Sequence, residues 1–386
     1  MNSFDTYFFL QFLLLLVSIY CGVKINKNNM KNVYVLIFIL TFTLIEGLRF
    51  GRGIDYNVYY YSFQTKDVFD VCKSNTILFD LLCFLLIKLG LPYQALIICS
   101  SSILAIAGTK LLIQYPKVLL LSLPWFYLQT FSAENLFRWY TAFSFLLLGI
   151  PYLLKDKTYI YLVCCIIGVQ FHIMMAIPAI LFYIISKAKS SLLSPWVSIL
   201  IYLFLSLVWS SSFMKNFISP INYLLSFWEH YTEVYGGNLG SWLDGSQHGL
   251  VEFSIIRQIL DSCKNIFLIF LVYKLIQKTK NKELVFYYNT MLLGIISYPA
   301  FAPIELFDRF NQLFLFFQCL IGSYCIIYSI RNFSYRKYAL LSLLTIIILG
   351  QGFYKRLTPS NKYFTYYIFN APVDGCLPIE WLIKGF

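Results

Sequence analysis

Charged residues are scarce in this sequence. Asp, Glu, Lys and Arg account for 12% of the 386 residues, whereas 59% are hydrophobic and 19% are aromatic. A soluble globular domain carries about twice that charged share. Long apolar runs, separated by short loops that contain Lys or Arg, recur along the whole sequence. The composition therefore excludes a soluble domain and predicts an all-α polytopic membrane protein, because a helix satisfies its own backbone hydrogen bonds within lipid.

The sequence also lacks the usual signatures of metal and redox sites. It has ten cysteines and three histidines, but no CxxC pair and no Cys/His spacing typical of a metal site. Most of the cysteines lie within apolar runs, where cysteine acts as a small hydrophobic residue. We therefore expect no metal site and no cofactor. The N-terminal apolar segment lacks the basic start and the cleavage site of a secretion signal, so we expect it to be the first span.

The formal net charge of +12 comes largely from short basic clusters between the apolar runs. Such clusters favour the cytoplasmic side of a membrane, because the insertion machinery and anionic lipid both retain them there. This arrangement argues against nucleic-acid binding and for contact with membrane lipid. The clusters are Lys24, Lys27 and Lys31; Lys155 and Lys157; Lys274, Lys278, Lys280 and Lys282; and Arg331, Arg336 and Lys337.

The apolar runs predict about 10–13 transmembrane or re-entrant helices in a single integral membrane domain, residues 1–386. The candidate segments are 4–23, 33–48, 76–91, 93–113, 118–132, 137–154, 158–186, 195–213, 258–276, 284–302, 310–330 and 338–354. If the loop at 24–31 is cytoplasmic, then the N-terminus and a first loop at 49–75 face outwards. The interval 214–257 has few basic residues, so we expect one larger extracytoplasmic loop there. The aromatic tail, residues 355–386, is expected on the same outer face.

Two of these segments do not fit a simple series of spans. The loops at 24–31 and 155–157 both read as cytoplasmic, yet five segments lie between them, and an even number must cross. Segment 76–91 is short and contains Asp80, so we predict a re-entrant or interfacial helix there. Segment 158–186 has basic residues at both ends. We predict two short tilted helices with His172 near the outer turn, although a single span remains an alternative.

Several ionisable residues lie at the predicted outer ends of helices, against the positive-inside trend. Ionisable groups at this depth are costly and usually functional. Arginine suits phosphate, because its planar guanidinium holds an oxyanion through two parallel hydrogen bonds. The residues are Arg49, Arg52 and Asp55 after the second segment; Arg138; His172; Arg257; and the neighbours Asp308 and Arg309. The pattern predicts a site for a diphosphate at the membrane surface.

Each of these residues also has a simpler interpretation. An arginine at a helix end often extends its side chain to the lipid headgroups. Asp55 can pair locally with Arg49 or Arg52, and Asp308 with Arg309. A single histidine in an apolar helix is often structural, and the tyrosines of the first loop, which resemble those of sugar sites, also suit interfacial anchoring.

Four motifs in this sequence resemble those of the EpsG family, the Wzy-like polymerases of bacterial O-antigen, capsule and exopolysaccharide. LRFGRGIDYNVY at 48–59 is similar to the family pattern LRY-x-x-G-T-D-Y-x-x-Y, with Arg49, Gly53, Asp55, Tyr56 and Tyr59 matching. NLFRWYTA at 135–142 resembles an Asn-x-x-Arg-Gln-x-x-Ala helix start, and QFHIMMAI around His172 resembles an FH-x-S-A helix. Asp308-Arg309-Phe310 is a looser fourth match. The sequence departs from the patterns at Ile54, Trp139, Met174 and Met175, and Arg52 is an addition to them.

The resemblance implies a glycosyltransferase that joins oligosaccharide repeat units carried on undecaprenyl diphosphate, at the outer leaflet of the bacterial plasma membrane. It implies that Arg49, Arg52, Arg138 and Arg309 bind the diphosphate, that Asp55 or His172 acts as base, and that Tyr56 and Tyr59 contact sugar. A residue of the 214–257 loop is a further alternative for the base. Arginines in a partly dry cavity can stabilise the charge that grows on the leaving diphosphate. The sequence has no DxD motif, and we expect no required metal, because arginine can supply the positive charge. A chain-length regulator and other assembly proteins are expected partners.

Two other classes of protein remain as alternatives. An O-antigen ligase or another lipid-linked-sugar glycosyltransferase uses the same arginine chemistry with a different acceptor. A flippase or transporter of lipid-linked oligosaccharide is less favoured, because transporters show internal repeats and charges near the midplane of the membrane. This sequence shows no internal repeat, and its charges gather at one predicted face.

Overall fold

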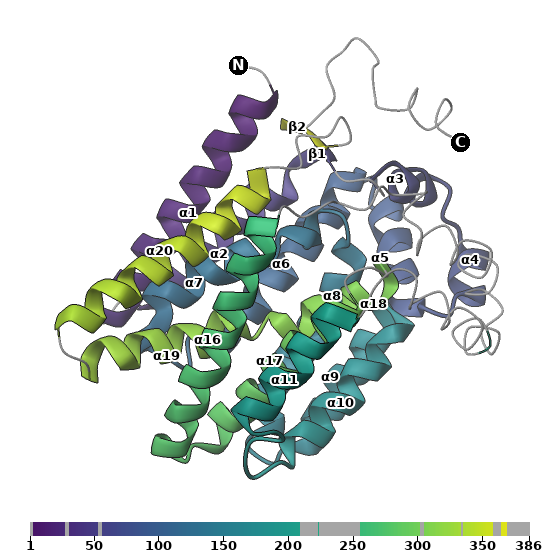
Figure 1. Ribbon diagram of the computed structural model, residues 1–386. Helices are drawn as coiled ribbons and strands as arrows, with labels where there is room; N and C mark the ends of the chain where they lie inside the picture. The colour runs from purple at the N-terminus through teal and green to yellow at the C-terminus, as the bar shows by residue number, and fades with distance from the viewer. Residues whose placement is uncertain are drawn as a thin grey trace. The chain divides into compact units, whose positions relative to one another are not determined.

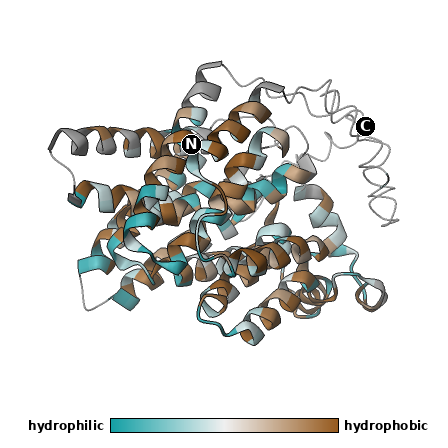
Figure 2. Cartoon of the chain, turned by 60° about the horizontal axis from the view of Figure 1, so that its bottom comes forward, coloured by the Kyte–Doolittle hydropathy of each residue, from teal (hydrophilic) through white to brown (hydrophobic). Residues whose placement is uncertain are grey.

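The computed structural model describes residues 3–27, 31–52, 56–208, 223, 255–301, 305–332, 335–357 and 364–368. Each apolar segment predicted from the sequence contains a helix (Figure 1). Among the described residues, four helical stretches are long and apolar enough to cross a membrane: Tyr7–Lys27, Tyr93–Leu112, Lys282–Phe301 and Phe307–Arg331. Hydrophobic residues, coloured brown in Figure 2, run along the helices. The predicted all-α polytopic membrane fold is confirmed. The predicted large outer loop, 214–257, lies almost entirely outside the described residues.

The chain divides into two compact units, and the first comprises residues 1–186 and 326–386. Its helices begin with α1 (Ser3–Lys27), α2 (Lys31–Gly47), α3 (Tyr56–Gln64), α4 (Val68–Lys73), α5 (Ile77–Lys88) and α6 (Tyr93–Leu112). They continue with η1 (Pro116–Val118), α7 (Leu119–Gln129), η2 (Phe131–Glu134), α8 (Phe137–Leu153), α9 (Thr158–Phe171), η3 (Ile173–Met175), α10 (Ala176–Ser186) and α20 (Tyr335–Leu357).

The second unit comprises residues 187–325. It contains α11 (Pro195–Val208), α16 (Ile255–Thr279), α17 (Lys282–Phe301), α18 (Glu305–Leu315) and the first half of α19 (Gln318–Asn332). The helix α17 lies in its core, since Asn289 is fully buried there. The Asn289 side chain donates to the Ser190 carbonyl at 3.0 Å and accepts from the Leu192 amide at 3.0 Å. These bonds tie the segment before α11 to α17.

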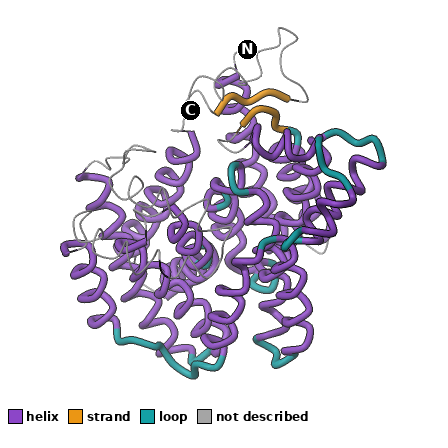
Figure 3. Tube along the Cα trace, turned by 90° about the vertical axis from the view of Figure 1, so that its right-hand side faces the viewer, coloured by secondary structure: helices purple, strands orange, loops and turns teal. Residues whose placement is uncertain are grey.

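A two-stranded antiparallel sheet joins distant parts of unit 1. Strand β1 (Arg49–Arg52) pairs with β2 (Phe364–Ile368), so that Arg49 lies opposite Ile368 and Arg52 opposite Phe364 (Figure 3). The predicted outer loop 49–75 therefore contains a strand and two short helices, α3 and α4. The sequence did not predict either strand, because neither has the length or alternation that identifies a strand locally.

Helix α5 is short because two residues stop it. Gly90 has a φ of +68°, and the amides of Gly90 and Leu91 donate to the carbonyls of Ile87 and Leu86. This is the Schellman arrangement that ends a helix, and Pro92 follows directly after Leu91. Twelve residues rise about 18 Å, which is less than the roughly 30 Å hydrocarbon layer. That segment 76–91 does not cross the membrane stays a prediction.

The segment 158–186 folds as a helical hairpin, as the sequence predicted. Helix α9 ends at Phe171, His172 takes an extended conformation, and α10 returns beside α9. The Tyr161 hydroxyl donates to the Ala179 carbonyl at 2.6 Å, a contact that a single straight span excludes. Helix α9 also packs closely on α8, because Gly168 has no side chain. A Cβ atom there would lie 2.9 Å from the Ala142 carbonyl oxygen.

Candidate functional site

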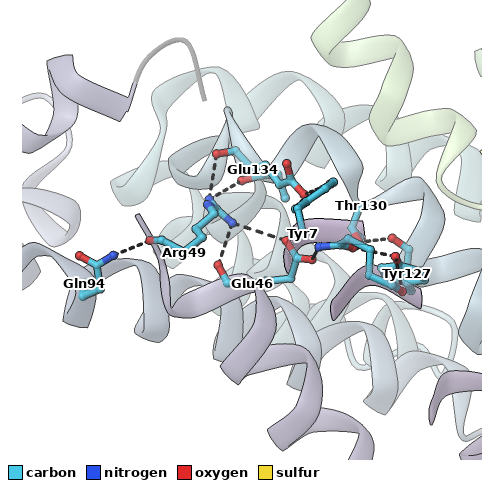
Figure 4. Close-up of polar contacts among 9 residues, drawn as sticks. Tyr7, Glu46, Arg49, Gln94, Tyr127, Thr130 and Glu134 are labelled. Atoms are coloured by element: carbon cyan, nitrogen blue, oxygen red, sulfur yellow. Dashed lines mark hydrogen bonds and ion pairs between the residues drawn. The ribbon is translucent and has the colours of Figure 1, made fainter. Parts of the chain in front are cut away.

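The Arg49 guanidinium lies in the interior of unit 1, at the junction of α2, β1 and η2. The residue is 2% exposed. Its Nη1 donates to the Glu46 carbonyl at 2.9 Å, and its Nη2 donates to the carbonyls of Glu134 at 2.8 Å and Ala133 at 3.3 Å (Figure 4). Carbonyls at the C-terminal ends of helices lack helical partners. Arg49 therefore caps the ends of both α2 and η2.

A second layer of polar side chains surrounds this arginine (Figure 4). The Glu46 carboxylate lies 3.6 Å from Arg49 Nη1 and accepts from the Gln11 amide at 3.0 Å. The Tyr7 hydroxyl donates to Glu134 Oε1 at 2.9 Å. The Gln94 amide donates to the carbonyl of Arg49 itself. Helices α1, α2, α6 and the η2 turn thus meet at one residue of the first motif.

A small cavity of about 10 Å³ lies beside this network, with room for about one water molecule. Its polar lining comes from Glu46, Arg49, Ser100, Ser101 and Thr130, among other residues. Two of the lining donors, Arg49 Nε and Ser100 Oγ, are buried and make no hydrogen bond to any described residue. The environment of Arg49 is therefore polar, but too small to hold a whole phosphate group in this conformation.

Arg138 is more accessible than Arg49, being half-buried in the first turn of α8. Its Nε donates to the Phe171 carbonyl at 3.0 Å, which caps the C-terminal end of α9. Its Nη2 donates to the Thr76 hydroxyl, and its guanidinium carbon lies 4.5 Å from the centre of the Phe79 ring. The remaining nitrogen, Nη1, bonds to no described residue, so Arg138 presents an unused donor.

The two tyrosines of the first motif pack into a cluster of aromatic rings. Tyr56 is buried and meets Tyr93 edge to face, with the ring centres 5.2 Å apart. Tyr59 is half-buried and contacts Phe137, with the ring centres 4.7 Å apart. Phe137 precedes Arg138 in the second motif. The aromatic cluster therefore places the first and second motifs side by side.

His172, in the third motif, lies next to the second motif as well. Its ring meets the Trp139 ring edge to face, with the centres 4.8 Å apart. The residue is half-buried, and its amide donates to the Gly168 carbonyl at 3.0 Å. Two neighbouring contacts therefore hold the end of α9 against the start of α8. One is the bond from Arg138 to the Phe171 carbonyl, and the other is the ring contact between Trp139 and His172.

The remaining predicted site residues are placed differently. Arg52 is the last residue of β1, and only its backbone is described, whereas Asp55 lies outside the described residues. Asp308 and Arg309 lie on α18 in unit 2, where Asp308 accepts from the Gln312 amide at 2.6 Å. The assignments of these residues to a substrate stay predictions.

Sequence reasoning missed several buried polar residues of this region, including two carboxylates. Glu46 is 4% exposed and Glu134 is 3% exposed. Each had a signal in the sequence, since Glu46 is an acidic residue inside an apolar segment and Glu134 directly precedes the second motif. Thr76 had none, because its partner Arg138 is 62 residues away.

The four motifs also lie within a part of the chain that matches a known family. No curated protein and no solved structure matches the chain. The model of the EpsG family matches residues 32–369, a range that includes all four motifs. Because this match covers most of the chain, the protein is a member of the EpsG family, a family of Wzy-like membrane proteins that act in the polymerisation of surface polysaccharide.

Proposed function

We propose that this protein is a polysaccharide polymerase that joins oligosaccharide repeat units carried on undecaprenyl diphosphate. It acts at the outer leaflet of the bacterial plasma membrane, with the site facing the periplasm or the exterior. The product is O-antigen, capsule or exopolysaccharide. The family assignment supports the class of reaction, and the chemistry of the arginines supports a diphosphate as the leaving group.

The observation that carries the proposal is the convergence of three motifs in unit 1. Tyr59, Arg138 and His172 come from three separate segments, and ring contacts and hydrogen bonds connect those segments. In the middle of them is a half-buried guanidinium with an unused donor. A cation held in place between segments that also carry a tyrosine and a histidine suits the transfer of a sugar from a diphosphate.

In the proposed reaction, the bond between the anomeric carbon of the growing glycan and its diphosphate oxygen breaks. A hydroxyl of the acceptor repeat unit forms the new glycosidic bond, and its proton passes to a base, which is Asp55 or His172. Undecaprenyl diphosphate leaves with the negative charge that develops on its oxygen. A fixed arginine stabilises that charge more strongly than water does, because it needs no reorganisation.

The arginines divide into two roles in this proposal. Both Nη atoms of Arg49 are engaged by carbonyl groups, which supports a positioning role: Arg49 fixes the start of the strand that ends in Arg52. Arg138 is half-buried and its Nη1 bonds to no described residue, so Arg138 is suited to contact the diphosphate. Of the two predicted sugar contacts, Tyr59 is the more exposed.

The test is gel analysis of the surface polysaccharide from a strain that lacks this gene. The strain is complemented with wild type, Arg138→Ala or Arg138→Lys, and with Arg331→Ala as the control, since Arg331 is exposed in the last turn of α19. Membrane levels of each variant are measured by immunoblot. We expect single repeat units without the gene and a full ladder with wild type or Arg331→Ala. Arg138→Ala should give no ladder at a normal protein level.

Other outcomes identify the alternatives. If the deletion strain lacks even the single-unit product, the protein is a ligase or a flippase rather than a polymerase. If the ladder is unchanged by the deletion, the proposed function is wrong. A full ladder from Arg138→Ala would remove Arg138 from the site while leaving the polymerase assignment intact.

A further inference from the structure

Thr76 directly precedes α5, at a position where a threonine side chain normally caps the helix. A capping hydroxyl accepts from a backbone amide in the first turn. Thr76 makes no such bond, although it is 6% exposed. Its Oγ1 accepts from Arg138 Nη2 instead. The one side chain suited to capping α5 is thus directed to an arginine of the second motif.

The direction of the hydrogen bond between Thr76 and Arg138 is determined by chemistry. Arginine has only donors, so Thr76 Oγ1 must be the acceptor in the bond with Arg138. The hydroxyl hydrogen of Thr76 is then available for Ser74 Oγ, which lies 3.1 Å away. Ser74 Oγ also accepts from the Thr76 amide at 2.9 Å. These bonds hold the Thr76 oxygen with its lone pairs toward Arg138.

The first turn of α5 is itself tied down by a buried ion pair. Asp80 Oδ1 lies 2.8 Å from Lys66 Nζ, and the Asp80 side chain is 5% exposed. Asp80 follows Thr76 by four residues, which places both on one face of the helix. Phe79, in the same turn, provides the ring beneath the Arg138 guanidinium. A single helical turn therefore supports Arg138 through a hydroxyl and a ring, and Lys66 anchors that turn.

We propose that Thr76 is a positioning residue for Arg138, and that the Lys66–Asp80 ion pair holds the turn from which Thr76 acts. Segment 76–91 thereby gains a role that does not require it to cross the membrane. The effect on turnover rests on the proposed function, because it assumes that Arg138 contacts the diphosphate. The effect on Arg138 itself does not.

The first test measures the Arg138 side chain directly. Purified protein in detergent is treated with phenylglyoxal, an arginine-selective reagent, and modification of Arg138 is followed by peptide mass spectrometry. Thr76→Val removes the hydroxyl and keeps the shape, and it should speed modification several-fold. Thr76→Ser keeps the hydroxyl and should behave as wild type. Thr109→Val is the matched control, because Thr109 is fully buried and its hydroxyl bonds to no described residue.

The same experiment tests the ion pair. Asp80→Asn should also speed modification of Arg138, whereas Asp261→Asn should not. Asp261 makes a comparable pair with Lys264 at 3.0 Å, within unit 2. Equal modification rates in wild type, Thr76→Val and Asp80→Asn would overturn the proposal. So would an equal increase in Thr76→Val and Thr109→Val, since that result means general loosening.

The second test measures turnover with the undecaprenyl-diphosphate-linked repeat unit of the host strain. Loss of a hydrogen bond to a charged group predicts a roughly 10–100-fold lower kcat for Thr76→Val, with recovery in Thr76→Ser. In an Arg138→Lys background, Thr76→Val should have little further effect. If the double variant instead loses kcat by the product of the two single-variant factors, the link between Thr76 and Arg138 is overturned. An inactive wild type refutes the proposed function instead, and the modification result stands independently of it.

Discussion

Replacing Arg49 with methionine is expected to destabilise the protein by about 3–5 kcal/mol, the usual cost of removing one partner from a buried charge pair. Methionine fills similar space without charge or donors. The substitution leaves Glu46, 4% exposed, without its cationic neighbour. It also removes the donor from the buried carbonyls of Glu46 and Glu134 and from the part-buried carbonyl of Ala133. Each lost charge-assisted bond is worth about 1.5–3 kcal/mol, and the losses are not additive because the same guanidinium makes all three.

The assay is equilibrium unfolding of the purified protein in mixed detergent micelles, with increasing SDS and far-UV circular dichroism as the signal. Arg331→Met is the matched control. Arg331 is exposed, so its loss should change the free energy of unfolding by no more than about 0.5 kcal/mol. Arg49→Lys keeps the charge but not the planar fork, so it should lose roughly half as much as Arg49→Met.

A change of less than about 1 kcal/mol for Arg49→Met would refute this reasoning, since it falls well below the loss expected for a buried pair. If such a stable variant also fails to make polysaccharide, then Arg49 acts directly on substrate and its contacts with carbonyls are not its main role. A large loss for Arg49→Met with near-normal activity of Arg49→Lys would support the positioning role.

Three further predictions concern the framework of unit 1. A chain ending at Leu357 lacks β2 and should lose the polysaccharide ladder, whereas one ending at Ile368 keeps the pairing with β1 and should retain it, as read on the same gels. Gly168→Ala should cost about 1–3 kcal/mol on SDS unfolding, because its Cβ would clash with α8; Gly350→Ala, with no atom within 4 Å, should not destabilise. Tyr161→Phe should cost about 0.5–1.5 kcal/mol by the same assay, through the lost bond to Ala179. No measurable loss for Gly168→Ala or Tyr161→Phe would contradict the packing of α9.

The helices were predictable because their signals are local. Apolar runs identify membrane helices wherever their partners lie, and Gly90 with Pro92 ends α5 within a few residues. The break at His172 was predictable too, since the basic residues at both ends of 158–186 favoured a chain that turns back over a single span. The motif residues were found for a similar reason, as arginine and histidine stand out in an apolar sequence.

The partners of those residues were not predictable from the sequence. Arg49 bonds to carbonyls 84 and 85 residues away, and Arg138 bonds to Thr76 across 62 residues. The strand beside Arg49 comes from near residue 368. Local sequence determines which segments become helices and which side chains are costly to bury. The packing of those helices decides which carbonyl, hydroxyl or carboxylate each costly side chain meets, because such contacts depend on distances in space that no short stretch of sequence encodes.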